Sequence, residues 1–442
     1  MFGIKGHLRI SPFKIIIFSF MAAILVGTLL LCLPFASNGE HPGFLDALFT
    51  ATSATCVTGL VVRDTWVGWT IFGKAVIILM IQVGGLGVVT IAMLITLLSG
   101  KKISLGQRTL LKEAISEERV GGILKLTSFI LKFTLFVELA GAVCMFPVFY
   151  AKYGAGEGIA FSLFHSISAF CNAGFDLSGR QAEFSSLMGF AANPLMNITI
   201  MALILVGGLG FRTWSDLGTK KCKIGKCRLQ TKVILFQTLV LVLIPALYFF
   251  IFEFASVPLG ERLQLSFFQS VTTRTAGFNT ADLAALTDTG KMVMIMLMLI
   301  GGAPGSTAGG MKTTTILVLV ASTFAVFSSK SQASVFKRRI PTEVIRRAAA
   351  LFLSYIFLFM FAAMIISQVE GLPLITCMFE TASAVGTVGL TLGITTTLGT
   401  ASKLILIFLM FFGRVGCMTL IFAAISFKAE GGAYPEEDIA IG

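Results

Sequence analysis

Four short stretches of the sequence share a pattern of small and hydroxyl-bearing residues that ends in a glycine. In each stretch the glycine follows a phenylalanine by ten positions, and the four glycines are Gly59, Gly174, Gly277 and Gly389. Glycine reaches backbone angles that other residues avoid, so such a loop can turn its carbonyl oxygens toward a common point. A ring of carbonyls of this kind can replace the water shell of an ion. The pattern predicts one ion-binding loop in four copies.

Each predicted loop takes in the five residues that end at its glycine. A short helix before each loop would direct its negative C-terminal end at the site, which favours a cation. The candidate ion-binding residues are Thr55, Cys56, Val57, Thr58 and Gly59; Phe170, Cys171, Asn172, Ala173 and Gly174; Thr273, Arg274, Thr275, Ala276 and Gly277; and Val385, Gly386, Thr387, Val388 and Gly389.

The composition places these loops in a membrane protein. Of 442 residues, 56% are hydrophobic and only 13% are charged, against about 25% charged residues in soluble domains. The first apolar segment, 15–34, is long enough to span a bilayer and has no small-residue cleavage site, which indicates a retained helix rather than a signal peptide.

The elements that must position the loops recur with the loops. Each unit has a long apolar helix, a short apolar segment before the loop, and a second long helix. A segment of about 11 residues covers roughly 16 Å, about half of the hydrocarbon core, so it must enter and return. The expected first helices are 14–33, 130–150, 233–254 and 349–368; the half-helices are 44–54, 158–169, 261–272 and 374–384; the second helices are 71–98, 194–214, 291–326 and 403–427.

The predicted fold is therefore an all-α integral membrane protein of four parallel helix–re-entrant loop–helix repeats, with eight transmembrane helices around a pseudo-fourfold pore. The repeats are expected at 1–100, 101–219, 220–329 and 330–442, the last with a C-terminal tail. Parallel units suit a pore better than the inverted repeats that many secondary transporters have. The net charge of +12 is clustered before the first unit and between units, which predicts cytoplasmic termini and lipid contacts rather than a nucleic-acid partner.

Two features of the second helices predict a gate. In the third unit a glycine-rich segment with a proline cannot hold a regular helix. In the fourth unit Arg414 lies within the apolar helix, where it should face the protein interior or water. We expect a movable loop opposite a fixed positive charge; its residues are Gly301, Gly302, Ala303, Pro304, Gly305, Ser306, Thr307, Ala308, Gly309 and Gly310. A packing kink and a structural arginine pair are the alternatives.

Glycine clusters at 84–87 and 207–210 occupy matching places in the first two units, where close helix packing through small residues is expected. Two carboxylates lie in apolar segments. We expect Glu380 to pair with Arg274 and brace the third loop, whereas Glu138 has no assigned partner.

These loops, the segment 301–310 and the Gly413-Arg414-Val415-Gly416 run resemble the Trk/Ktr/HKT superfamily of potassium transporters, and most of all the membrane subunits of bacterial Ktr potassium uptake systems. The resemblance covers nearly the whole chain. It implies a bacterial plasma-membrane homodimer that carries potassium ions, held at Gly59, Gly174, Gly277 and Gly389, and a cytosolic KtrA-like regulatory ring that binds ATP or ADP. Sodium is a candidate activating ion, and no organic cofactor is expected.

Two departures from potassium-channel filters bear on selectivity. No copy reads Thr-Val-Gly-Tyr-Gly, and the third copy puts Arg274 beside the filter. Fewer carbonyl layers should give fewer ion sites. A sodium-coupled transporter that works by alternating access is the main alternative, and a membrane scaffold without transport is another. Nothing indicates an enzyme, because the glycine-rich segment lacks the Gly-Lys-Ser/Thr of a phosphate loop.

Overall fold

The computed structural model describes residues 11–39, 41–91, 110 and 123–424. The helices of the first two units are α1 (Pro12–Leu31), α2 (Phe44–Cys56) and α3 (Ile71–Leu86), then α6 (Ile123–Tyr153), α7 (Ala155–Cys171), α8 (Pro194–Gly208) and α9 (Phe211–Thr219). Those of the last two are α10 (Leu229–Tyr248), which continues as a π-helix over Phe249–Glu253, α11 (Leu259–Thr272), α12 (Asp288–Leu299) and α13 (Thr313–Phe327), then α14 (Thr342–Glu370), α15 (Leu374–Gly386), α16 (Thr400–Val415) and α17 (Cys417–Ala424).

Several helices begin where the sequence offers a side-chain cap. Ser11 precedes Pro12 and accepts from the Lys14 amide, and Asn193 does the same ahead of Pro194. Thr70 and Thr287 cap α3 and α12. Such caps satisfy backbone amides that have no partner within the helix, and proline fits the first helical position.

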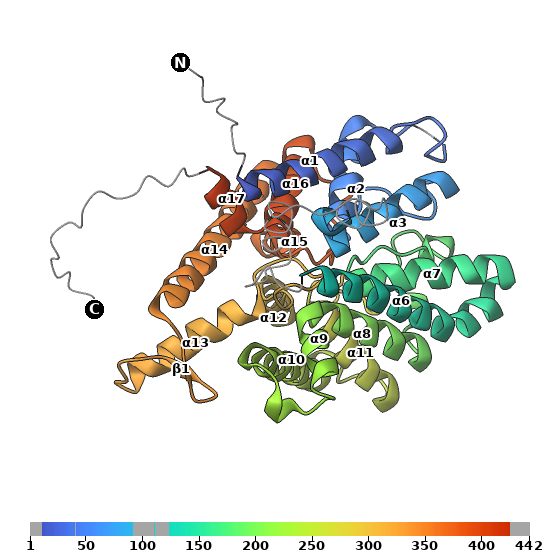
Figure 1. Ribbon diagram of the computed structural model, residues 1–442. Helices are drawn as coiled ribbons and strands as arrows, with labels where there is room; N and C mark the ends of the chain where they lie inside the picture. The colour runs from blue at the N-terminus through green and yellow to red at the C-terminus, as the bar shows by residue number, and fades with distance from the viewer. Residues whose placement is uncertain (1–10, 40, 92–109, 111–122, 425–442) are drawn as a thin grey trace, which may run out of the picture.

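The four units occupy successive quadrants around a common centre (Figure 1). Within a unit the first helix packs on the half-helix, as α1 does on α2 and α14 on α15. Between units, each second helix packs on the half-helix of the next unit, and the cycle closes from the fourth unit to the first through α3–α7, α8–α11, α12–α15 and α16–α2. The half-helices α2, α7, α11 and α15 therefore form the inner layer of the molecule.

Among the described residues, the four helices long and apolar enough to cross a membrane are the first helices of the four units, at Pro12–Leu31, Lys125–Tyr153, Leu229–Glu253 and Thr342–Glu370. The first and third of these helices lie within four residues of their expected bounds, whereas α6 and α14 each begin seven residues earlier than expected. The half-helices also match, since each differs from its expected bounds by at most three residues at either end.

The second helices differ from the expectation because each is interrupted. The expected helix 194–214 is instead α8 and α9, which are bent by 90° at Gly208–Phe211. The expected helix 291–326 stops at Leu299 and resumes at Thr313, so the break extends beyond 301–310 on both sides, and the expected helix 403–427 breaks between α16 and α17. The helix expected at 71–98 is interrupted after Leu86 at Gly87 and is helical again over 88–91, and residues 92–98 lie outside the described residues.

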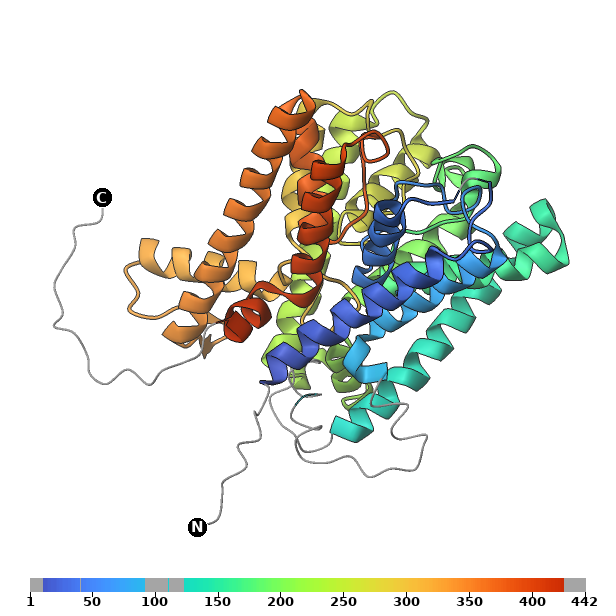
Figure 2. The same cartoon turned by 90° about the horizontal axis from the view of Figure 1, so that it is seen from above.

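The breaks have a backbone cause. Gly87, Gly210 and Gly416 follow the helical segments with φ of 88°, 84° and 88°, in a left-handed region that side chains disfavour. With five further glycines and a proline, the third unit opens into a longer loop. After it, α13 runs out sideways from the core and ends near a small hairpin of β1 (Ser334–Val335) and β2 (Arg338–Arg339), at a steep angle to α14 (Figure 2).

The sequence has four basic clusters, at 5–14, 101–112, 220–228 and 337–347. The first two, and the C-terminal tail, lie mostly outside the described residues. The cluster at 220–228 follows α9, and the cluster at 337–347 spans the hairpin and the start of α14. Both lie at the junction between the last helix of one unit and the first helix of the next.

Candidate functional site

The four loop glycines contact one another in a closed cycle. A Cβ atom added to any of them would collide with the carbonyl oxygen just before the next glycine. Built on Gly59, Gly174, Gly277 and Gly389, that atom would lie 2.5, 2.6, 2.2 and 2.2 Å from the carbonyl oxygens of Ala173, Ala276, Val388 and Thr58, respectively. Each loop thus holds its carbonyl against the glycine of its neighbour, and the fourth loop closes on the first.

The same two positions in every loop have left-handed backbone angles. The glycines have φ of 93°, 68°, 81° and 93°, and the residues two places earlier, Val57, Asn172, Thr275 and Thr387, have φ of 58°, 60°, 71° and 51°. A side chain in this region costs roughly 1–2 kcal/mol. Strain of this kind is kept only where the surrounding structure demands it, and four matched copies indicate one functional geometry.

Hydroxyl groups from the half-helices hold the loops. Ser53 and Ser383 accept hydrogen bonds from the amides of Gly59 and Gly389 at 3.1 and 3.0 Å. Ser168 donates to the Phe175 carbonyl at 2.7 Å, and Thr272 donates to the Phe278 carbonyl at 2.6 Å. All four hydroxyls are buried, so each loop is anchored just before or just after its turn.

The glycine clusters of the second helices lie directly behind these loops. Added Cβ atoms at Gly84, Gly207 and Gly413 would lie 1.9, 2.0 and 2.1 Å from the carbonyl oxygens of Thr55, Phe170 and Val385. The clusters therefore serve close packing, as expected for the first two units, and a neighbouring glycine then ends each helix. The sequence pattern did not distinguish a packing glycine from a helix-ending one.

The loop at 300–312, which we call the intramembrane loop, bridges the second and fourth units. The amide of Ala303 donates to the Gly208 carbonyl at 2.9 Å, and the amide of Phe211 donates to the Gly305 carbonyl at 3.0 Å. On the other side the Gly310 amide donates to the Gly413 carbonyl at 3.1 Å. The loop is therefore packed between the second and fourth units.

Arg414 joins the intramembrane loop to the first unit. Its guanidinium donates to the carbonyl oxygens of Thr307, Gly84 and Gly85, the last at 3.1 Å. It lies in the last turn of α16, not in the middle of a helix as expected. Its positive charge lies at the C-terminal end of α3, where helix carbonyls carry partial negative charge. Through Thr307 the predicted charge is also in direct contact with the predicted loop.

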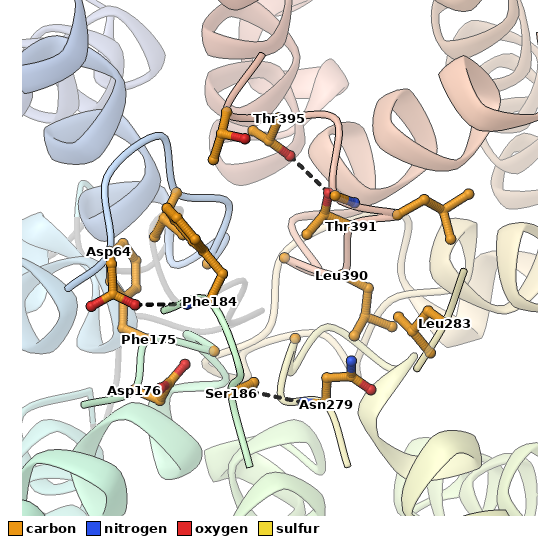
Figure 3. Close-up of a pocket in the computed structure, with 18 of the residues that line it drawn as sticks. Asp64, Phe175, Asp176, Phe184, Ser186, Asn279, Leu283, Leu390, Thr391 and Thr395 are labelled. Atoms are coloured by element: carbon orange, nitrogen blue, oxygen red, sulfur yellow. Dashed lines mark hydrogen bonds between the residues drawn. The ribbon is translucent and has the colours of Figure 1, made fainter. Parts of the chain in front are cut away.

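Two cavities flank the ring. The vestibule, of about 260 Å³, is lined by all four loop glycines and by the segments that follow them. Figure 3 shows Asp64 and Asp176 on one wall and Thr391 and Thr395 on another. The second cavity, of about 340 Å³, is lined by the ends of the second helices, including Gly85, Gly305, Lys312 and Arg414. We call it the Arg414 cavity.

The predicted pair of Arg274 with Glu380 is wrong. Glu380 instead accepts hydrogen bonds from Thr391 at 2.5 Å, from the Leu392 amide at 3.0 Å and from Thr395 at 2.9 Å. It braces the segment after its own loop glycine. Because Thr391 and Thr395 are in the same unit, these local hydroxyls satisfy the carboxylate and the arginine is not needed.

Glu138 has a partner that the sequence did not identify. Gln82 of α3 donates to its carboxylate at 3.3 Å, and the Cys171 thiol lies 3.7 Å from the Gln82 amide oxygen. This buried group packs behind the second loop. Gln82 lies two residues before the Gly84–Gly87 cluster, and a polar residue at that place in an apolar helix was the available signal.

The vestibule acids were also missed, although their spacing was visible. Asp64 and Asp282 each follow a loop glycine by five positions, and Asp176 follows one by two. Asp64 accepts from the Trp66 and Val67 amides and from the Phe184 amide of the next unit, at 2.8, 3.0 and 2.9 Å. It therefore also ties the first unit to the second.

The arrangement suits a monovalent cation without its water shell. Four backbone carbonyl oxygens, one from each loop, are gathered in the cycle of loop glycines. The half-helices α2, α7, α11 and α15 end beside this cycle, which adds negative potential. Within the described part of the chain, no cluster of His, Cys, Asp and Glu side chains could hold a metal ion. The chemistry of the site comes from the backbone.

Comparisons with known proteins give the same picture. A profile of the family described as "TrkH: Cation transport protein" matches residues 9–430. The chain is 41% identical to the potassium/sodium uptake protein NtpJ of Enterococcus hirae, over 98% of both chains. It is 37% identical to the Ktr system potassium uptake protein B of Bacillus subtilis, over 98% of this chain and 97% of that protein.

Among solved structures, the potassium transporter TrkH of Vibrio parahaemolyticus is similar, with a TM-score of 0.72 and 19% sequence identity. The match covers 95% of this chain and 86% of that one. The similarity supports a shared fold. The resemblance that the four loops indicated from sequence is confirmed by the family profile and by the full-length relatives.

Proposed function

Since the chain belongs to the TrkH family of cation transport proteins, we propose that it takes up potassium across the bacterial plasma membrane through a channel-like pore. The four-glycine ring is its selectivity filter, and the intramembrane loop with Arg414 is its gate. The observation that carries the proposal is the closed cycle of contacts from each loop glycine to the carbonyl of the next loop. Membership of this family also identifies the protein as a transporter rather than an enzyme.

The pore path in this proposal runs from the vestibule through the ring to the Arg414 cavity. The vestibule faces the outside, and its acids draw cations to the ring. The Arg414 cavity faces the cytoplasm, where the intramembrane loop and the guanidinium close the path beneath the ring. Four parallel repeats with eight crossings, as proposed here, would put both termini in the cytoplasm, and the basic clusters between units support this orientation.

The relatives support the choice of ion and partner. Potassium is named in the uptake proteins of Enterococcus hirae and Bacillus subtilis, and sodium in the former. The name "Ktr system" indicates a multi-part assembly. We propose a homodimer that carries a cytosolic nucleotide-binding ring, with sodium as a second ion.

Flux measurements test this function. Purified protein in liposomes, with and without the ring, should take up potassium and rubidium down their gradients and carry sodium more slowly. A sodium-coupled secondary transporter is the second candidate, favoured by the word sodium in the name of the Enterococcus hirae protein. Potassium uptake against its gradient at zero voltage, driven by sodium, would establish that candidate and exclude a channel-like pore.

Shortening the intramembrane loop should uncouple flux from the ring. Deleting residues 306–309 removes the Thr307 carbonyl that Arg414 contacts and the Ala308 carbonyl that Lys312 contacts at 2.7 Å. We expect a folded protein whose potassium flux is high with either nucleotide on the ring, because the two-state element is gone. Deletion of residues 329–332, in the exposed segment between α13 and β1, is a control for chain length. A shortened protein that kept its full nucleotide response would show that the gate is elsewhere.

Acid on the vestibule side should weaken potassium uptake. Burial raises the pKa of Asp176 to about 6, with nearby Asp64 adding to the effect and a hydrogen bond from the Ser178 amide opposing it. Below that pH the carboxyl is neutral, and the vestibule loses a negative charge worth up to about 1 kcal/mol. The potassium concentration for half-maximal uptake should rise about twofold to fivefold between pH 7 and pH 5.

Asp176→Asn should remove most of this pH dependence and show the high half-maximal concentration at pH 7. An unchanged pH profile in Asp176→Asn would assign the titration to another group.

A further inference from the structure

We propose that Thr307 holds the second filter loop in its ion-selecting shape, so that the intramembrane loop sets selectivity as well as flux. This rests on the proposed function. Thr307 is fully buried, and its hydroxyl donates to the carbonyl oxygen of Phe170 at 3.0 Å. Phe170 is in the last turn of α7, where carbonyls have no partner within the helix. The hydroxyl from the loop satisfies one of them.

Thr307 is itself held in place from two sides. Its amide donates to the Gly207 carbonyl at 3.3 Å, and its own carbonyl accepts from Arg414. The second filter loop and the intramembrane loop both pack closely against Gly207 of α8. A Cβ atom there would lie 2.0 Å from the Phe170 oxygen, 2.8 Å from the Thr307 hydroxyl and 2.9 Å from the Asn172 side-chain oxygen. The gate loop and the second filter loop meet on this glycine.

Asn172 of the second filter loop is in turn hydrogen-bonded to the third filter loop. The Asn172 side-chain amide donates to the Arg274 carbonyl at 3.3 Å and to the Thr275 hydroxyl at 3.2 Å. A displacement of Thr307 therefore frees the Phe170 carbonyl. Phe170 lies two residues before Asn172, which links the second filter loop to the third.

The other filter loops lack such a link. In the first and fourth units the carbonyls equivalent to that of Phe170 are those of Thr55 and Val385, which pack against Gly84 and Gly413. In the described part of the chain, neither accepts a hydrogen bond from a side chain of the intramembrane loop. Among the described residues, a side chain thus joins the gate to the second filter loop alone, and the position of the gate affects the shape of that loop.

Isosteric substitution tests the link. In Thr307→Val the shape of the side chain is kept and the donor is lost; in Thr307→Ser the donor is kept. Full-length protein in liposomes is assayed by ⁸⁶Rb⁺ uptake, with potassium and sodium as competitors. The selectivity ratio is the sodium concentration that halves uptake divided by the corresponding potassium concentration. We expect Thr307→Val to lower this ratio about fivefold, the factor that corresponds to about 1 kcal/mol for one hydrogen bond, and Thr307→Ser to keep the wild-type ratio.

Thr28→Val is the matched control, because Thr28 is buried in α1 and donates only to the Ile24 carbonyl of its own helix, at 2.8 Å. It should keep the wild-type ratio. If Thr307→Val cannot be recovered folded, Thr307→Ala removes the same donor without added bulk. A folded Val or Ala variant with altered flux but the wild-type ratio would overturn the proposal and leave Thr307 a gating role only. Absence of uptake by the wild-type protein would instead count against the proposed function.

Discussion

Replacing Gly389 or Gly59 by serine is expected to lower the discrimination between potassium and sodium at least tenfold. An added Cβ atom would lie 2.2 Å from the Thr58 carbonyl oxygen in the first case and 2.5 Å from that of Ala173 in the second. Both positions also have φ of 93°, which costs a side chain roughly 1–2 kcal/mol. Relief of either strain must move a carbonyl of the ring, and a loss of about 1.4 kcal/mol is already tenfold.

Competition of sodium and potassium against rubidium uptake measures the change. Gly371→Ser is the matched control: it has φ of 67°, but nothing lies within 4 Å of its added Cβ atom. It carries the backbone strain without touching the ring, and it should keep wild-type selectivity. Unchanged selectivity in both Gly389→Ser and Gly59→Ser would rule these glycines out as filter residues.

Neutralising Arg414 to glutamine should raise potassium flux at least tenfold in protein without its activating ring. The guanidinium donates to the carbonyls of Thr307, Gly84 and Gly85 and so fastens the intramembrane loop to the end of α3. Hydrogen bonds to a charged group contribute roughly 1.5–3 kcal/mol each. Glutamine has a shorter side chain and no charge, so the loop population should shift toward the open state, and the positive barrier in the cavity is removed as well.

Uptake of ⁸⁶Rb⁺ over a range of concentrations provides the measurement. Arg414→Lys should give an intermediate flux, because the charge remains but the planar, forked donor does not. Lys291→Gln removes a basic side chain that pairs with Asp288, at 3.6 Å near the start of α12, and should leave flux unchanged. A folded Arg414→Gln protein with wild-type flux would reduce Arg414 to a structural role.

The half-helices and filter loops were predictable because they are repeated. A single loop such as Thr55–Gly59 is compatible with many structural roles, whereas four copies at matched positions favour one repeated site. The bounds of α2, α7, α11 and α15 followed from short apolar segments that cannot cross a bilayer. The cyclic contact between loops was implied by the repeat order, and the structure adds its direction, from each glycine to the preceding carbonyl of the next loop.

The breaks in the second helices were not predictable from the same signals. Glycines within an apolar helix serve close packing in membranes, and Gly84 and Gly207 do so here. Gly87 and Gly210 end helices through left-handed φ, a difference that depends on the backbone around them. Only in the third unit, where a proline lies among the glycines, did the sequence predict the break.

The partners of buried charged groups were also beyond sequence reasoning. Glu380 was assigned to Arg274 because it opens the fourth half-helix, next to the third loop that holds Arg274, but Thr391 and Thr395 donate hydrogen bonds to its carboxylate instead. Arg414 was placed correctly in the interior on energetic grounds. That its donors reach carbonyls of Gly84 and Thr307 depends on how the first and third units meet, which no local pattern contains.

The most direct test of the central claim is to locate a bound cation by anomalous diffraction from crystals grown with thallium(I), which replaces potassium. The proposal predicts a peak at the centre of the ring, surrounded by the carbonyl oxygens of Thr58, Ala173, Ala276 and Val388, and loss of that peak in Gly389→Ser crystals. A wild-type protein whose thallium peak lies away from the ring, or which shows none there at saturating thallium, would contradict the four-glycine filter.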